Sequence, residues 1–168
     1  ALLLRKLGNN KPILVLGYAP FERVGECIKN NIRVVAYNKE LLDYLETIGN
    51  QISNGKKLKI HIKVETGTSR QGIADEELAE FAKKASQNPN IFIEGIYTHF
   101  ANIEDTTDPS YAMEQLRRFN KSVKELEELG INIPIKHTAC SAALINYPKT
   151  RFNMVRAGIS LYGLWSSN

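Results

Sequence analysis

The stretch from residue 59 to residue 99 decides the fold, because a strand pattern, a helix pattern and a second strand pattern follow one another there. The first strand is Lys59-Ile-His-Ile-Lys-Val64, in which polar and apolar side chains alternate, and the second is Ile91-Phe-Ile-Glu-Gly-Ile-Tyr-Thr-His99. Between them, Asp75 to Gln87 is predicted to be a helix. Strands that alternate with helices are typical of parallel sheets with helical crossovers.

The same alternation runs along the whole chain. The clearest helix ends at Leu129, since apolar residues recur in it at three- and four-residue spacing and Gly130 supplies a stop. A short helix or turn is expected after Cys140. The predicted strands are 12–18, 32–37, 59–64, 91–99, 131–138 and 152–161, and the longer predicted helices are 21–30, 39–53, 75–87 and 112–129.

These elements predict an α/β fold, a partial (β/α)8 TIM barrel of about six parallel strands over residues 1–168. A complete barrel usually needs about 250 residues and eight strand–helix units, so roughly two units are expected to be absent. The beginning of the chain reads as the end of a helix, which leads to the expectation that the chain is cut at both ends. An open doubly wound sheet is the alternative that length alone favours.

Composition excludes several classes of protein. Of the 168 residues, 43% are hydrophobic and 24% charged, which is ordinary for a folded domain. The net charge of +4 is dispersed, so no nucleic-acid partner is expected, and the apolar runs are far too short for a membrane helix. Two cysteines, Cys27 and Cys140, are too few for a disulfide framework and indicate a cytoplasmic protein. The three histidines lack zinc-motif spacing, so no metal is predicted.

Polar residues gather where four consecutive predicted strands end, and α/β folds bind ligands at that edge of the sheet. The groups are 65–70, His99 with Asn102, 137–141 and 156–162. Within Met154-Val-Arg-Ala-Gly-Ile-Ser-Leu-Tyr-Gly163, Arg156 requires a ligand or a carboxylate, because a buried guanidinium is costly without a partner.

Each of the remaining candidates has two interpretations. The loop Thr66–Gly72 can cradle an anion, with Arg70 as a donor, or be a surface turn. Lys63 and His61 can point into a barrel or face solvent on an edge strand. Ser141 can be a helix cap or a ligand donor.

For two further candidates, a structural or packing role is better supported than a catalytic one. His99 is more often a structural hydrogen-bond bridge than a catalyst at such a strand end. Cys140 has no nearby base in sequence, so packing or a cofactor contact is favoured over a nucleophile.

Four motifs, in this order, resemble bacterial alanine racemase. They are Lys63-Val-Glu-Thr-Gly-Thr-Ser-Arg-Gln-Gly-Ile73, Glu94-Gly-Ile-Tyr-Thr-His-Phe-Ala101, His137-Thr-Ala-Cys-Ser-Ala-Ala143 and Met154–Gly163, and the resemblance covers essentially the whole chain. It implies a pyridoxal 5′-phosphate (PLP) enzyme, homodimeric as the parent protein, that interconverts L- and D-alanine through a PLP aldimine for cell-wall D-alanine supply. Residues 1–168 would be the incomplete PLP-binding barrel domain, without its first two strands and without the C-terminal β domain.

The resemblance also implies roles for individual residues. Ser141, with the amides of Gly158 and Ile159, would hold the cofactor phosphate, and Arg156 would face the pyridine nitrogen. His137 and Cys140 would belong to the same cofactor site, and His99 would orient Arg156. Arg70 would reach the cofactor phenolic oxygen or the substrate carboxylate, and Lys63 matches a position that is carbamylated in many members of the family.

Departures from the family pattern leave the substrate and the activity open. Cys140 stands where the family usually has asparagine, and relatives altered in this region include serine racemases. The Schiff-base lysine and the opposite-face tyrosine of the family both lie outside this chain, so it is expected to be inactive alone. The sequence is also compatible with a non-catalytic PLP-binding barrel and with a phosphate-binding α/β scaffold.

Overall fold

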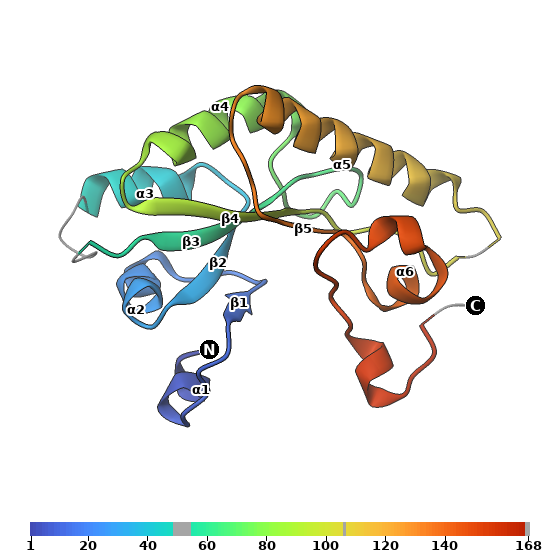
Figure 1. Ribbon diagram of the computed structural model, residues 1–168, viewed down its shortest axis with the longest axis horizontal. Coiled ribbons are helices and arrows are strands. Elements are labelled where there is room, and N and C mark those ends of the chain that lie inside the picture. Colours follow the sequence, from blue (N-terminus) through green and yellow to red (C-terminus); the bar gives the residue numbers. More distant parts are fainter. Residues whose placement is uncertain (49–54, 106, 167–168) are drawn as a thin grey trace.

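Five parallel strands form one curled sheet in the order β1-β2-β3-β4-β5, with each strand beside its neighbour in sequence (Figure 1). The computed structural model describes residues 1–48, 55–105 and 107–166. The strands are β1 Ile13–Val15, β2 Ile32–Ala36, β3 Leu58–Lys63, β4 Ile91–Tyr97 and β5 Ile135–His137. A sheet in which each strand pairs with the next is the arrangement of a (β/α)8 barrel, and here it makes a partial barrel.

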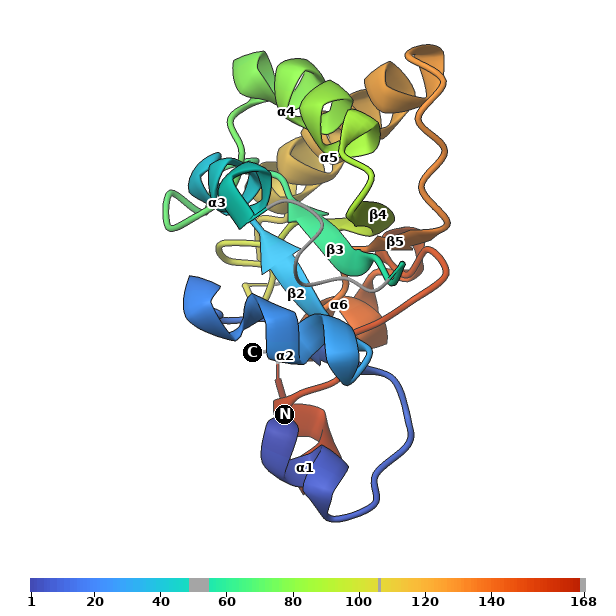
Figure 2. The same cartoon turned by 90° about the vertical axis from the view of Figure 1, so that its left-hand side faces the viewer.

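Helices cover the outer face of the curled sheet. Helices α3, α4 and α5 lie along one side of it in both views (Figures 1 and 2). The helices are α1 Leu2–Lys6, η1 Phe21–Arg23, α2 Val24–Lys29, α3 Glu40–Ile48, α4 Asp75–Gln87, α5 Ser110–Glu128, α6 Ser141–Asn146, η3 Pro148–Thr150 and η4 Ile159–Tyr162. The part of the predicted helix 39–53 beyond Ile48 lies outside the described residues. In the described part of the chain, no helix combines the length and the apolar character needed to cross a membrane.

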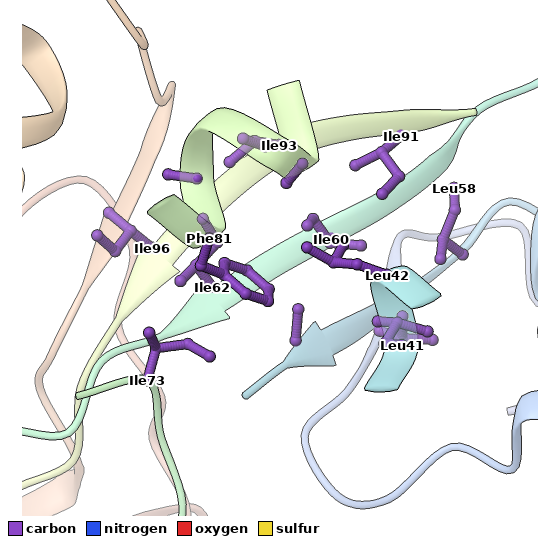
Figure 3. Packing of buried hydrophobic residues seen from close by; sticks show 14 of the residues in the cluster. Leu41, Leu42, Leu58, Ile60, Ile62, Ile73, Phe81, Ile91, Ile93 and Ile96 are labelled. Atoms are coloured by element: carbon purple, nitrogen blue, oxygen red, sulfur yellow. The ribbon is translucent and has the colours of Figure 1, made fainter. Parts of the chain in front are cut away.

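The main core lies between the outer face of the sheet and these helices. Ile60 and Ile62 of β3 are completely buried, and Phe81 of α4 packs over them (Figure 3). Leu41 and Leu42 of α3 close the same layer. Because side chains alternate along a strand, His61 and Lys63 point to the opposite, concave face. Of the two interpretations given for these residues, their burial, with 2% and 3% of their surface exposed, favours the inside of a barrel over an edge strand that faces solvent.

The predicted sixth strand, 152–161, is wrong. Phe152 has a φ of +44°, a left-handed conformation that a strand does not contain, and residues 159–162 form η4. The side chain of Asn153 accepts from the amide of Lys136 at 2.8 Å and donates to the carbonyl of Pro134 at 2.7 Å. A side-chain amide therefore satisfies the backbone groups of β5 that a sixth strand would have paired with.

Strand β5 is also shorter than the predicted strand 131–138. Pro134 has no backbone N–H, so the ladder to β4 begins only at Ile135, which pairs with Gly95. One backbone hydrogen bond, from the amide of Arg156 to the carbonyl of Ala139 at 2.9 Å, ties the segment after α6 back to the end of β5.

Candidate active site

A cluster of hydroxyl and backbone amide groups lies at the beginning of α6. Ser141 is the first residue of α6, and its Oγ accepts from the amide of Gly158 at 2.9 Å and from the amide of Ser160 at 3.3 Å. The Ser160 hydroxyl lies 3.2 Å from the same oxygen. Two backbone N–H groups and the Ser160 hydroxyl thus converge on the Ser141 hydroxyl, and donors of these kinds commonly bind phosphate oxygens.

Arg156 lies beside this cluster, across the carboxyl ends of β4 and β5. Its Nη1 donates to Nδ1 of His137 at 2.6 Å and to the His137 carbonyl at 3.1 Å. Its Nη2 donates to the carbonyls of Thr98 at 2.9 Å and Thr138 at 3.0 Å, and Nδ1 of His99 lies 3.5 Å away. All of these acceptors are uncharged. The guanidinium is therefore held in place without a carboxylate to neutralise it.

Tyr97 supports both the arginine and its histidine partner. The rings of Tyr97 and His137 stack with centroids 4.7 Å apart and an angle of 3° between their planes. The Arg156 guanidinium carbon lies 4.9 Å from the Tyr97 ring centroid, within the range of a cation–π contact. Burial raises the pKa of Tyr97 to about 12, so its hydroxyl stays protonated at neutral pH.

Positive charge accumulates around the concave end of β3. Burial, assisted by Arg70 and Arg156, lowers the pKa of Lys63 to about 8. Burial, assisted by Arg156, Arg70 and Lys63, lowers the pKa of His99 to about 4. In the described part of the chain, no carboxylate lies within ion-pair distance of Lys63. Glu65 opposes the effect of the two arginines on Lys63 only in part, so the site presents an excess of positive charge, which favours an anionic ligand.

The backbone amides of the loop after β3 surround the carboxylate of Glu65, a residue of the same loop. Burial acts to raise the pKa of Glu65, but the backbone amides of Gly67, Thr68, Ser69 and Arg70 lower it more, and the net pKa lies below the ordinary value. The Gly67 amide donates to Glu65 Oε1 at 2.5 Å. The predicted anion cradle of this loop thus holds an internal carboxylate, and the Arg70 side chain is left exposed.

A buried hydrogen-bond network anchors the loop to β4. Gln115 of α5, completely buried, donates to the His99 carbonyl at 3.2 Å and to Thr66 Oγ1 at 3.3 Å. Thr66 and Thr98 share a hydroxyl contact of 2.7 Å. The Thr68 hydroxyl also donates to the His99 carbonyl. These bonds fix the ends of β3 and β4 relative to each other.

A family model described as the N-terminal domain of alanine racemase matches residues 1–166. The chain belongs to this family. It is 45% identical to the alanine racemase of Methanococcus maripaludis over 168 residues, and 41% identical to alanine racemase 2 of Caldanaerobacter subterraneus over 170 residues. These alignments cover 99% and 100% of this chain but only 44% and 43% of the relatives. The chain thus spans less than half the length of the alanine racemases that it matches.

Solved structures of alanine racemases share the fold. Alanine racemase of Clostridium difficile 630 superposes with a TM-score of 0.92 at 35% identity, over 99% of this chain and 46% of that one. A histidine racemase from Leuconostoc mesenteroides superposes with a TM-score of 0.79 at 27% identity, over 99% and 44%. The prediction of a partial TIM barrel of the alanine racemase type is therefore confirmed.

The structure places most of the predicted site residues close together. The histidine nearest to Arg156 is His137 rather than His99, and His137 is completely buried beside the guanidinium. The amides that bond to Ser141 are those of Gly158 and Ser160. The Sγ of Cys140 lies 3.8 Å from Glu104 Oε1, at the edge of the site.

Sequence reasoning placed Ser160 in the polar group 156–162 but assigned it no contact, and it missed Tyr97 as part of this site. A hydroxyl two residues after Gly158 can reach the same point as the glycine amide because the chain turns there. Tyr97 is the last residue of β4, and the predicted strand 91–99 placed it on the same face as His99 two residues later. Within the described residues, no group of three or more His, Cys, Asp or Glu side chains is arranged to hold a metal.

Proposed function

We propose that this chain is the cofactor-binding barrel part of a PLP-dependent alanine racemase. The observation that carries the proposal is Arg156, a partly buried guanidinium whose acceptors are all uncharged, beside the cluster of donors on Ser141. These donor groups fit PLP, which combines a phosphate dianion with an aromatic ring whose nitrogen can accept a hydrogen bond. Ser141, Gly158 and Ser160 would hold the phosphate, and Arg156 would donate to the ring nitrogen.

Arg156 sets the electronic character of the site. When bound, PLP supplies an electron sink that makes the Cα proton of an amino acid removable. A permanent cation at the ring nitrogen disfavours a proton on that nitrogen, which weakens the sink. Arg156 stays a cation because a guanidinium is not deprotonated in proteins, and its neutral acceptors leave that charge uncompensated. A carbanion that is only weakly stabilised is reprotonated quickly, which suits racemisation better than side reactions.

The cationic residues of the concave end would receive the negatively charged groups. Arg70 is exposed at the mouth of the site and close enough to Lys63 and His99 to lower the pKa of both. Arg70 would bind the substrate carboxylate or the cofactor phenolic oxygen. A racemase needs a base on each face of Cα, and we assign both bases to the part of the relatives' length that this chain does not span.

Lys63 is the residue that we propose to be carbamylated. Its amine is buried, its pKa is lowered to about 8, and no carboxylate pairs with it in the described part of the chain. The neutral amine would attack carbon dioxide, forming an N–C bond and releasing one proton. The product is an anion that can pair with Arg70. A carbamate signal in the NMR spectrum of protein equilibrated with ¹³C-labelled bicarbonate, absent from Lys63→Met, tests this.

Titration with PLP, followed by absorbance, tests the proposed cofactor site. We expect non-covalent binding that Arg156→Ala and Ser141→Ala weaken. The matched control is Arg151→Ala, because Arg151 lies on the same segment and, among the described residues, its side chain donates to the carbonyl of Leu144 alone. Equal affinity of Arg156→Ala and the unmutated chain would refute the site. An adduct reducible by borohydride would show that a lysine of this chain forms the Schiff base, against our assignment.

The activity belongs to the parent protein, which we propose to be a cytoplasmic homodimer that supplies D-alanine for the cell wall. Both cysteines in the described chain are free thiols, in keeping with a reducing compartment. The substrate is tested by D/L interconversion of alanine and serine by the parent. We expect alanine to be the better substrate. A preference for serine would assign the altered residue Cys140 to substrate choice, and PLP binding without turnover of either would favour a non-catalytic barrel.

A further inference from the structure

A line of hydrogen-bonded side chains leads from Arg156 along the concave face to the opposite end of the strands. Nε2 of His137 lies 2.9 Å from Nδ1 of His61, and Nε2 of His61 lies 3.3 Å from Glu94 Oε2. The Glu94 carboxylate accepts two bonds from Arg33, at 2.7 and 3.0 Å. The two histidines are buried, with at most 2% of their surface exposed. The line therefore joins the cofactor end of the barrel to a buried ion pair at its other end.

The two ends of this line force the same arrangement of protons. A guanidinium can only donate, so Nδ1 of His137 must accept from Arg156 and its proton must lie on Nε2. That proton is donated to Nδ1 of His61, whose own proton must then lie on Nε2 and point to Glu94. An ionised carboxylate can only accept, so the Glu94 end demands the same direction. Only one arrangement of protons satisfies every bond.

The charges of the groups along the line agree with this arrangement. Burial, with a contribution from Arg156, lowers the pKa of His137 to about 2. Burial lowers the pKa of His61 although Glu94 acts in the opposite direction. Burial acts to raise the pKa of Glu94, but the hydrogen bonds from Arg33 and His61 lower it by more, so the net pKa lies below the ordinary value. Two neutral imidazoles therefore lie between a carboxylate and a guanidinium at neutral pH.

The backbone of β4 is shaped to admit the His61 ring. A Cβ added at Gly95 would lie 2.3 Å from His61 Nδ1 and 2.5 Å from its Cε1, so no other residue leaves room for the ring there. The register between β3 and β4 shifts at the same place, where His61 pairs with Gly95 after Ile60 has paired with Ile93. This shift lets Glu94 reach His61. Two independent backbone features thus serve the same contact.

We propose that Glu94 is a positioning residue for Arg156, and that it acts through His61 and His137. By fixing both imidazoles, it keeps the Nδ1 lone pair of His137 turned to the guanidinium. Because two neutral rings separate the carboxylate from Arg156, the arginine is oriented without being neutralised, and its charge is kept for the ligand. The consequence for PLP binding rests on the function proposed above, whereas the proton arrangement can be measured on the ligand-free chain.

The first measurement needs no variant. Long-range ¹H–¹⁵N spectra of the histidine-labelled chain should show His61 and His137 as neutral rings with the proton on Nε2, unchanged between pH 6 and pH 8. Spectra of an arginine-labelled chain should resolve slowly exchanging Nη protons of Arg156. A proton on Nδ1 of either ring, or a doubly protonated ring, would overturn the proposal whether or not PLP binds.

Variants then test positioning. Gly95→Ala displaces the His61 ring while leaving every charged group in place, and Gly17→Ala is the matched control, because a Cβ at Gly17 meets nothing within 4 Å. We expect Gly95→Ala to accelerate exchange of the Arg156 Nη protons roughly tenfold, as for loss of a coupling of about 1.4 kcal/mol. Backbone amides at the centre of β3, such as Ile62, should keep their protection and so report an intact fold. Unchanged Arg156 exchange in a folded Gly95→Ala chain would overturn the positioning role.

A second pair of variants addresses Glu94 itself. Glu94→Ala removes the acceptor and should accelerate Arg156 exchange, whereas Glu94→Gln retains an oxygen that can accept from His61 and should restore slow exchange. Arg156 exchange that is the same in both variants as in the unmutated chain would refute the role of Glu94. PLP affinity should fall in Gly95→Ala and Glu94→Ala and recover in Glu94→Gln. If the NMR results hold while no variant of the chain binds PLP, the proposed cofactor fails and the proton arrangement stands.

Discussion

The two faces of β3 are made from alternate residues of one strand, yet they are stabilised in different ways. Ile60 and Ile62 on the convex face are completely buried against helices and have only apolar neighbours to satisfy. His61 and Lys63 on the concave face are equally buried, but each requires a polar environment of a definite kind. Dispersion and hydrophobic burial are non-directional, whereas buried polar groups depend on the identity and orientation of their partners. The comparison separates the face that makes the fold from the face that makes the site.

The largest effect should come from a cavity on the convex side. Phe81 of α4 is 1% exposed and packs against β3 and β4 (Figure 3). Phe81→Ala should lower the free energy of unfolding by about 3–5 kcal/mol, because it removes buried ring surface and leaves a cavity. Urea denaturation measures the loss.

Phe92→Ala is the matched control for this change. Phe92 lies on β4 but is 43% exposed, so its truncation should cost far less. Equal losses in the two variants would mean that the convex layer is not the main source of stability.

On the concave face, removing a charge should stabilise the fold. Lys63 is buried and its pKa is lowered to about 8, so the folded state disfavours its charged form. Since the unfolded amine titrates near its ordinary value of 10.5, the penalty is complete below pH 8 and disappears as the pH rises to about 10.5. Lys63→Met should raise the free energy of unfolding at pH 7 by up to about 3 kcal/mol in protein free of carbon dioxide.

Lys59→Met is the control on the same face of the same strand. Its amine is 3.6 Å from Glu94 and its side chain is one third exposed, so its removal should bring no gain. If the two variants changed stability equally, or if the gain of Lys63→Met persisted above pH 10.5, the buried charge would not be the cause.

The convex face could be read from the sequence and the concave face only in part. Alternation in 59–64 and 91–99 predicted the two strands, and the helix 75–87 was predicted with its observed ends. These are local patterns, so a single sequence contains them. The sixth strand failed because its partner groups on β5 are taken by the side chain of Asn153, a contact across 17 residues that periodicity does not encode.

Site prediction had the same limit. Arg156 was identified because an arginine is chemically unusual in an apolar run and Ser141 because it begins a short helix, whereas the joint role of Ser141 and Gly158 was implied by the resemblance to alanine racemase. The partnership of His61 with His137 was not foreseen, since 76 residues separate the rings. It depends on the register shift between β3 and β4 and on the missing side chain of Gly95, and both are properties of the assembled sheet.

The effect that is smallest at neutral pH, and that grows only as the pH falls, is a pH dependence that belongs to the concave face alone. His137 titrates at about 2 in the folded chain and near 6.5 when unfolded, because burial excludes its charged form. Between these values the unfolded state binds the additional proton, so stability is complete above pH 6.5 and falls by about 1.4 kcal/mol per pH unit as the pH decreases. His99 should contribute the same slope, but only down to its folded pKa of about 4.

His137→Gln and His99→Gln each replace an imidazole by a side chain that stays neutral. Both variants should therefore show a smaller fall of stability with decreasing pH between pH 6 and pH 4, and only His137→Gln should do so below pH 4. Thermal or urea unfolding at half-unit pH steps measures this slope, and Ile62→Val on the convex face serves as the control. The control should lower stability by roughly 1 kcal/mol at every pH without altering the slope, because no proton is involved. A slope that is unchanged in His137→Gln would show that the ring is charged when buried. That outcome would also contradict the hydrogen bond from Arg156, because a doubly protonated ring has no nitrogen left to accept it.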